Sequence, residues 1–213
     1  LAYCEFYYGW LYYAKGNGKL IVEHFNNCIK YSEEAKWYMI VGYAFGGLGF
    51  GQYLLEDLEN ARKNIEKGIK IVEDIEVQLA LSGLYWLLSM VLFDLGEYGK
   101  ALASIDEALI LAQKYNEKRF EGLSRIWLGR ILGKTDPNQF DKAEESILQG
   151  INILEEMRLK PFFSGGYLCL GEFYTDVDQK EKAQENLKKA KRMFQEMGMD
   201  YWLAKTREIL NRL

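Results

Sequence analysis

Two kinds of apolar pattern alternate along the chain. In one kind, apolar residues recur at offsets of 0, 4, 7 and 8, as at Ala101, Ile105, Ala108 and Leu109, which is the spacing of one face of an α-helix. In the other kind, as in residues 85–92, almost every position is apolar, so such a helix must be covered on more than one side. The patterns therefore predict helical hairpins, each with an inner apolar helix and an outer amphipathic helix. No segment has the period of a β-strand.

The hairpin pattern repeats about every 40 residues. A small residue of the inner segment recurs at intervals of 40, 40, 40 and 42 residues, at Gly9, Gly49, Ser89, Gly129 and Gly171. The two additional residues fall in segment 134–140, where Asp136-Pro137-Asn138 is typical of a surface turn. A fixed period of this length predicts a stack of repeats, which we place at about residues 1–33, 34–74, 75–115, 116–157 and 158–198.

Two of the units carry the residues of a known repeat most clearly. They read Leu88-Ser89...Leu92...Gly96...Ala101...Ile105...Ala108 and Leu170-Gly171...Tyr174...Ala183...Leu187...Ala190. This order resembles the Leu-Gly, Tyr, Ala, Phe, Ala pattern of the tetratricopeptide repeat (TPR), and the resemblance covers about residues 1–198. It implies an all-α fold, a right-handed α-solenoid of five TPR helical hairpins.

Two features depart from the usual TPR pattern. The unit is 40 residues long instead of about 34, and the position of the family's final proline holds a polar residue in each unit, at Glu33, Glu73, Gln113, Glu155 and Gln195. These helix formers predict an outer helix that continues for about another turn. Units of this length resemble the C-terminal TPR arrays of bacterial cyclase-linked and ATPase-linked signalling proteins. That resemblance implies one part of a larger, cytoplasmic protein that acts in signal transduction.

The two ends of the array differ. Residues 199–213 predict a C-terminal capping helix with Asp200 as its N-cap, and such a helix would cover the stacking surface of the last repeat. At the other end Tyr3 and several more aromatic residues appear at once, so we expect a preceding repeat there. The uncovered N-terminal repeat leaves a homo-oligomer open as one interpretation.

Composition excludes several classes of protein. The chain is 49% hydrophobic and 27% charged with a net charge of -4, which is typical of a globular protein rather than a disordered one. Its pI near 5.3 and its lack of a long basic tract argue against nucleic acid as a partner. The apolar stretches are shorter than the roughly 20 residues that span a bilayer, so no membrane partner is expected. Three scattered cysteines, Cys4, Cys28 and Cys169, favour a reducing cytoplasm over a disulfide framework.

Residues with catalytic chemistry are scarce. His24 is the single histidine, and it lies on an outer helix between core positions. The motifs of zinc proteases, redox dithiols, serine hydrolases and nucleotide-binding loops do not occur. The glycine run at residues 46–51 has no preceding strand and no following lysine, so it favours close helix packing over phosphate binding. The sequence therefore predicts no enzyme, no cofactor and no metal site.

The inner helices carry the residues that could bind a partner. In TPR proteins the concave face binds ligands, and the resemblance places there Tyr3, Phe6, Trp10, Tyr13, Tyr43, Phe50, Tyr53, Trp86, Met90, Phe93, Trp127 and Arg130. Each aromatic ring can bury about 150–250 Å², so a few open rings would form a large apolar patch. An alternative is that tight curvature packs some of these rings against the neighbouring inner helix.

Three functions fit these residues. The first is a non-catalytic scaffold for protein-protein interaction that binds an apolar or aromatic peptide or helix in the groove. Phe50, Trp86, Met90 and Trp127 would then be anchors, and Arg130 would orient the ligand. The second is an effector-sensing domain that binds a small molecule beside the aromatic walls. The third is self-association. A clamp for an acidic chaperone tail is disfavoured, because Arg130 is the only cation among these positions.

Overall fold

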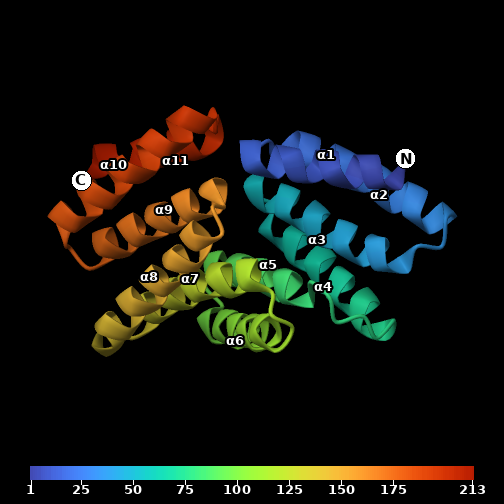
Figure 1. The fold of residues 1–213 in the computed structure, drawn as a ribbon, viewed down its shortest axis with the longest axis horizontal. Coiled ribbons are helices and arrows are strands. Elements are labelled where there is room, and N and C mark those ends of the chain that lie inside the picture. Colours follow the sequence, from blue (N-terminus) through green and yellow to red (C-terminus); the bar gives the residue numbers. More distant parts are fainter. The chain divides into compact units, whose positions relative to one another are not determined.

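The computed structural model describes residues 1–213, apart from the side chain of Pro137. The chain is helical throughout, and the described residues contain no strand (Figure 1). The elements are α1 (Ala2–Lys15), α2 (Gly18–Glu34), α3 (Tyr38–Leu54), α4 (Leu58–Asp74), α5 (Leu81–Asp94), α6 (Tyr98–Lys114), α7 (Lys118–Thr135), η1 (Pro137–Gln139), α8 (Phe140–Glu156), α9 (Lys160–Asp176), α10 (Lys180–Met197) and α11 (Asp200–Arg212). The predicted all-α array of five hairpins and a final helix is confirmed.

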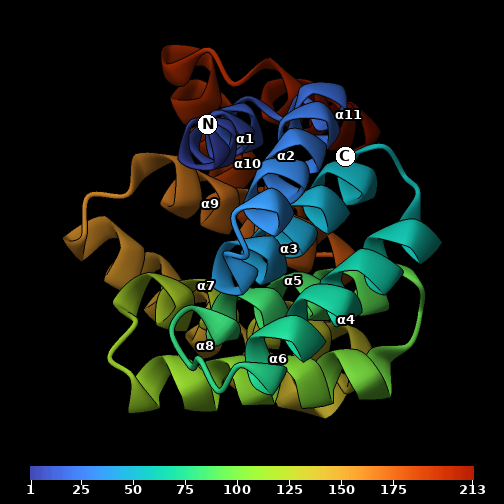
Figure 2. The ribbon, with the colours of Figure 1, turned by 90° about the vertical axis from the view of Figure 1, so that its right-hand side faces the viewer.

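The helices fall into two compact units, Leu1–Leu111 and Ala112–Leu213, called here the N-terminal unit and the C-terminal unit. Within each unit an inner helix packs against its own outer helix, as α3 does with α4 and α7 with α8. The next inner helix then lies on the outer helix before it, as α3 lies on α2 and α9 on α8 (Figures 1 and 2). The last helix, α11, packs against α10 and α9.

The small and aliphatic columns of the sequence form the core of each hairpin. Ile21, Ala61, Ala101, Ala143 and Ala183 are completely buried, and so are the residues four positions after them, Phe25, Ile65, Ile105, Ile147 and Leu187. Burial of these side chains on one face explains why the outer helices are amphipathic.

Glycine pairs set how closely the two helices of a hairpin approach. A Cβ placed on Gly68 of α4 would lie 2.5 Å from the carbonyl oxygen of Gly42 in α3. The C-terminal unit repeats this contact, since a Cβ on Gly150 of α8 would lie 2.4 Å from the carbonyl oxygen of Gly122 in α7. Backbone against backbone leaves no room for a side chain, so the helix-interior glycines are required by the crossing.

Nearly all helices end in the same way. Each of these helices is followed by one residue with positive φ, and successive residues of this kind are mostly 20 positions apart. They are Gly16, Lys36, Glu56, Glu76, Gly96, Asn116, Arg158, Asp178 and Gly198. At each of them two backbone hydrogen bonds turn back onto the helix, as when Lys36 N–H donates to the Glu33 carbonyl and Trp37 N–H to the Ser32 carbonyl. This is the Schellman arrangement. The exception is α7, after which Asp136 is extended and the inserted residues form η1.

Two of the polar residues at the family's proline position, Glu73 and Glu155, bind the following hairpin. Glu73 accepts a hydrogen bond of 2.7 Å from the Tyr85 hydroxyl, and Glu155 accepts one of 2.9 Å from the Tyr167 hydroxyl. The outer helices continue past this position, to Asp74 and Glu156. These glutamates therefore link one repeat to the next.

One prediction about the final helix is wrong. The residue before α11 is Met199, and no side chain accepts a capping hydrogen bond there. Asp200 is instead the first helical residue, where its carboxylate stabilises the positive end of the helix dipole. The helix buries Leu203 and Thr206 against the unit.

Candidate functional site

A continuous series of aromatic rings follows the inner helices of the N-terminal unit. We call Phe6, Trp10, Tyr13, Phe50 and Tyr53 the aromatic strip. The ring centroids are 6.1 Å apart for Phe6 and Trp10, 5.3 Å for Trp10 and Tyr13, 4.3 Å for Tyr13 and Phe50, and 5.9 Å for Phe50 and Tyr53. The strip thus crosses from α1 to α3 without a gap. Edge and tilted contacts of this kind stabilise a fixed ring arrangement.

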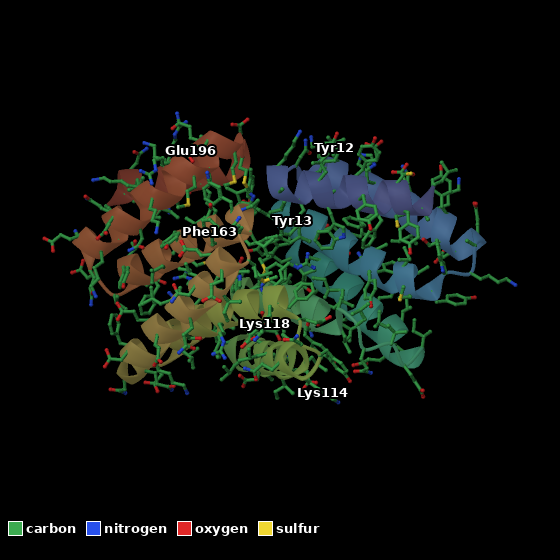
Figure 3. All side chains as sticks on the ribbon, in the orientation of Figure 1. Tyr12, Tyr13, Lys114, Lys118, Phe163 and Glu196 are labelled. Atoms are coloured by element: carbon green, nitrogen blue, oxygen red, sulfur yellow. The ribbon has the colours of Figure 1, made fainter. Side chains whose placement is uncertain are left out.

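Neighbouring residues of α1 contribute to different surfaces. Tyr13 packs on Phe50 of α3, whereas Tyr12 stacks on His24 of α2 with a centroid distance of 5.3 Å. Figure 3 shows Tyr12 and Tyr13 on different sides of α1. The Nδ1 atom of His24 lies 2.7 Å from Glu5 Oε2. His24 is therefore a half-buried, hydrogen-bonded residue that packs on Tyr12 and not on the rings of the aromatic strip.

Most predicted groove residues of the N-terminal unit keep part of their surface open. Tyr3 is exposed, and six others are half-buried: Phe6, Trp10, Tyr13, Tyr43, Tyr53 and Phe93. Two hydroxyls are hydrogen-bonded within the unit. Tyr43 donates to the Leu79 carbonyl, and Tyr53 donates to Asp94 Oδ2 over 2.7 Å. These bonds orient the rings at the edge of the strip.

Three of the predicted anchors are not accessible. Phe50 is 2% exposed, Trp86 is 3% exposed and Met90 is 5% exposed. They belong to the packed interior in this conformation, so a ligand cannot contact them as the sequence suggested. For Phe50 the reason is the close contact with Tyr13, which covers the ring. The alternative that some rings pack against the neighbouring inner helix thus applies to Phe50. Trp127 is half-buried.

Arg130 is held by two carboxylates and is not an open orienting charge. It is a buried residue of α7 in the C-terminal unit, and its guanidinium lies 3.1 Å from Asp176 Oδ2 and 3.6 Å from Glu172 Oε2, both on α9. Lys205 of α11 lies 3.8 Å from the other oxygen of Glu172. Burial by itself would lower the pKa of Arg130, but the negative charges of Glu172 and Asp176 outweigh it and raise the pKa. The inner face of this unit is therefore ionic.

A cavity of about 570 Å³ opens beside this ionic group in the C-terminal unit. Its wall contains Asp136 from the inserted turn, Asp176 from α9, and the rings of Phe140 and Phe173, which stack with centroids 5.2 Å apart. The two-residue insertion that breaks the sequence period therefore forms part of the wall. The sequence analysis gave no signal for this cavity, because its lining residues come from two hairpins.

The described residues offer little else that is reactive. Within them no three histidine, cysteine or acidic side chains are grouped as a metal site would need. Burial raises the pKa of the Cys28 thiol to about 11, so this sulfur is unreactive at neutral pH. In the part of the chain that the structure describes, no helix is long and apolar enough to cross a bilayer.

Comparisons with known proteins agree with this fold. Residues 82–115, which cover α5 from its second residue and all of α6, match the model of the tetratricopeptide repeat family. No curated protein matches the chain. Among solved structures, aspartyl phosphate phosphatase F from Bacillus subtilis is 17% identical with a TM-score of 0.75, and the alignment covers 92% of this chain and 49% of that one.

Two further structures are similar over nearly the whole chain. One is a Rap conjugation gene regulator of a plasmid in complex with the Phr* peptide, with 14% identity, a TM-score of 0.69, and coverage of 99% of this chain and 62% of that one. The other is a signal transduction ATPase with numerous domains and a tetratricopeptide repeat sensor from Pyrococcus horikoshii, with 18% identity, a TM-score of 0.65, and coverage of 99% and 31%. The chain thus spans only part of the length of these proteins, and it has the fold of TPR arrays.

Proposed function

Because the chain folds as a TPR array, we propose that it is a non-catalytic protein-interaction module that binds an apolar or aromatic peptide or helix along the aromatic strip. The observation that carries this proposal is the unbroken series of rings from Phe6 on α1 to Tyr53 on α3. Four of the five rings keep a partly open face. Tyrosine and tryptophan in such positions often contribute most of the binding energy of an interface.

The arrangement of the strip favours an apolar ligand with aromatic or aliphatic anchors. Trp10 and Tyr13 lie in the middle of the strip. The Trp10 ring packs against Phe25, and the Tyr13 ring packs against Phe50. A ring that is already fixed loses little conformational freedom when a ligand binds.

The similar structures support a peptide ligand and a signalling context. The Rap regulator was crystallised with the Phr* peptide, and another Rap protein was crystallised with Competence and Sporulation Factor. The similar archaeal ATPase contains a tetratricopeptide repeat sensor. On this basis we place the chain in a larger cytoplasmic signalling protein, of the kind found in bacteria, whose activity it would regulate through a bound partner.

A peptide selection followed by measured affinities tests this proposal. Peptides of about 10 residues would be selected against the chain, and the dissociation constant of the best one measured by calorimetry. Trp10→Ala should weaken binding at least 10-fold, since a central aromatic anchor typically contributes about 2 kcal/mol or more. Leu148→Ala is the matched control, because Leu148 is an exposed apolar residue on the outer helix α8.

Circular dichroism on each variant separates loss of binding from loss of fold. If peptides bind Trp10→Ala and Tyr13→Ala as tightly as the unaltered chain while both variants remain helical, the aromatic strip is not the binding site.

A small effector is a second candidate, favoured by the cavity of about 570 Å³ in the C-terminal unit. Its size falls in the range of small-molecule sites, and its wall combines stacked phenylalanines with carboxylates. A thermal-shift screen with small metabolites tests this candidate, because a ligand of the folded state must raise the unfolding temperature. Phe140→Ala should abolish any such shift. A shift that persists in Phe140→Ala would place the ligand elsewhere.

A further inference from the structure

One face of α1 is apolar and open to solvent. Leu1, Cys4, Tyr8 and Leu11 recur at helical spacing along it, and Tyr7 lies beside them. All five are exposed, with fractions of 84% for Leu1, 67% for Tyr7, 52% for Tyr8 and 49% for Leu11. We call these five residues the α1 stripe. It borders the aromatic strip, because the Tyr7 ring contacts the Phe6 ring with centroids 5.9 Å apart.

The corresponding residues of α3 form a packed interface. Forty positions after the α1 stripe, α3 carries Val41, Ala44, Gly47, Leu48 and Gly51, and all five are buried. A Cβ on Gly47 would lie 2.3 Å from the Phe25 ring of α2, and a Cβ on Gly51 would lie 2.8 Å from Ile21 of α2. This face of an inner helix therefore packs against the outer helix of the preceding hairpin.

The C-terminal unit uses the same face in the same way. Gly166 of α9 is the counterpart of Ala44, and a Cβ there would lie 2.6 Å from Ile151 of the preceding outer helix α8. Leu170, the counterpart of Tyr8, is also buried. The position on the inner helix, and not the particular residue, thus defines the interface between repeats.

We propose that the α1 stripe is a docking surface for a further TPR-type hairpin, whose amphipathic outer helix lies on α1 as α2 lies on α3. The interface between repeats continues onto α1 in register, and its residues there are Leu, Cys, Tyr, Tyr and Leu. The stripe holds no charged side chain. It therefore matches the apolar side of an amphipathic helix.

The size of Tyr7 restricts which outer helix can bind. Its counterpart in α3 is glycine, and the Phe25 ring of α2 fills the space that a side chain would need. With Tyr7 at this position, the docking helix must carry a smaller, aliphatic residue where α2 has phenylalanine. Outer helices with this property exist in the chain, since the equivalent residues of α4, α8 and α10 are Ile65, Ile147 and Leu187.

Two fusions that differ in one residue test the proposal. A copy of residues 1–40 placed directly before Leu1 keeps the period of 40 and puts its own outer helix on α1. One fusion retains phenylalanine at position 25 of the copy, and the other carries Phe25→Ile there. Isoleucine suits the copy's own hairpin, because Ile65 already packs against Gly49 in the second hairpin. The copy also carries Cys4→Ser, and Cys169→Ser removes the half-buried thiol.

Labelling of Cys4 in the α1 stripe reports docking, since Cys4 is exposed and Cys28 is buried. The Phe25→Ile fusion should slow the labelling of Cys4 at least 10-fold relative to the unfused chain and unfold at a higher temperature. The fusion that retains phenylalanine should protect Cys4 much less. A control with Cys4→Ser and Leu148→Cys, labelled on α8, should react at the same rate in every background.

Three results would overturn the proposal. Labelling of Cys4 in the Phe25→Ile fusion at the unfused rate, with helicity raised by the added hairpin, would show that the stripe does not accept this helix. Equal protection in both fusions would contradict the restriction by Tyr7. A dimer of the unfused chain in sedimentation equilibrium, with Cys4 protected at dimer concentrations, would make a second copy the occupant.

Discussion

The N-terminal unit lines its inner helices with half-buried aromatic rings, whereas the C-terminal unit lines them with an ionic group of Arg130, Glu172 and Asp176. The hairpins beneath these surfaces are nevertheless built alike. Gly42 and Gly68 bring the helices of one hairpin together, and Gly122 and Gly150 do the same in the other unit. In both units most helices are followed by a residue with left-handed backbone, and α7 is the exception.

This difference shows which positions of the repeat are free to vary. The crossing glycines and the buried columns of the outer helices are fixed by packing, because a change there meets backbone or core atoms. Inner-face side chains meet other side chains rather than backbone, as Tyr13 meets Phe50 and Arg130 meets Asp176, so they can be aromatic in one unit and charged in another. We therefore expect substitutions at the helix crossing to change stability alike in both units, and substitutions on the inner faces to have different effects in the two units.

The largest effect is expected at the aromatic core of the N-terminal unit. Phe25 is completely buried and fills the space beside Gly9 and Gly47. Phe25→Ala should lower the free energy of unfolding by about 3–5 kcal/mol, measured by urea denaturation. Gly47→Ala should be costly alone and nearly neutral in the Phe25→Ala background, because the two residues share one space. Additive costs in the double variant would contradict this size pairing.

Next in size are the crossing glycines, which test the similarity of the units. Gly68→Ala and Gly150→Ala each direct a methyl group at a backbone carbonyl, and each should cost about 2–3 kcal/mol. Hydrogen exchange resolved along the sequence would locate each loss in its own unit. Gly99→Ala is the control, since a Cβ at Gly99 has no atom within 4 Å. If Gly150→Ala left the free energy of unfolding unchanged while Gly68→Ala lowered it, the two crossings would not be equivalent.

A smaller, pH-dependent effect should appear in the C-terminal unit. Burial alone would raise the pKa of Glu121, but hydrogen bonds from Lys118 and Arg125 outweigh it and hold the pKa below its usual range. Because the folded pKa lies below the unfolded one, the ionised carboxylate stabilises the fold above about pH 4.3, and this stabilisation is lost as the pH falls through the folded value.

Glu121→Gln should therefore cost about 1–2 kcal/mol at pH 7. Denaturant titrations at a series of pH values should show the stabilities of the two proteins converging as the pH falls through the lowered pKa of Glu121. A difference that is constant with pH would mean that Glu121 acts through packing and not through its charge.

The smallest effects concern the shared helix ends. Glu56 and Asp178 hold left-handed backbone with φ of 62° and 56°, which is unfavourable for residues with a side chain. Glu56→Gly in one unit and Asp178→Gly in the other should each stabilise the chain by about 0.5–1 kcal/mol. Gly96 has a φ of 77° and open space around it, so Gly96→Ala should destabilise the chain. Melting temperatures suffice to rank the three variants.

The repeat, the helices and the buried columns could be predicted from the sequence. Residues such as Ala101 and Ile105 lie on one face of an outer helix whatever surrounds it, because helical spacing alone brings them together. Five agreeing units made this pattern reliable, and both residues are completely buried as expected. The glycine run at residues 46–51 was likewise correctly attributed to helix packing, since Gly46, Gly47, Gly49 and Gly51 all contact neighbouring side chains closely.

The helix ends could be predicted only in part. Gly16 and Gly96 are of the residue type that favours a left-handed helix end, but Lys36, Glu56 and Arg158 adopt the same conformation without being glycine. Their backbone follows from the return of the chain to the next helix, and tertiary packing stabilises it against a local cost of about 1–2 kcal/mol per residue. No local sequence signal marks such a position.

The sequence by itself determined that this chain is a stack of five helical hairpins and which residues belong to the inner helices. Only the tertiary structure decided which inner residues remain open. Trp10 and Phe50 occupy the same repeat position, yet Trp10 is half-buried and Phe50 is covered by Tyr13. Arg130 likewise finds its carboxylates on another hairpin. Periodicity reports the face on which a residue lies, whereas exposure and charge pairing depend on the size and chemistry of side chains that are distant in sequence.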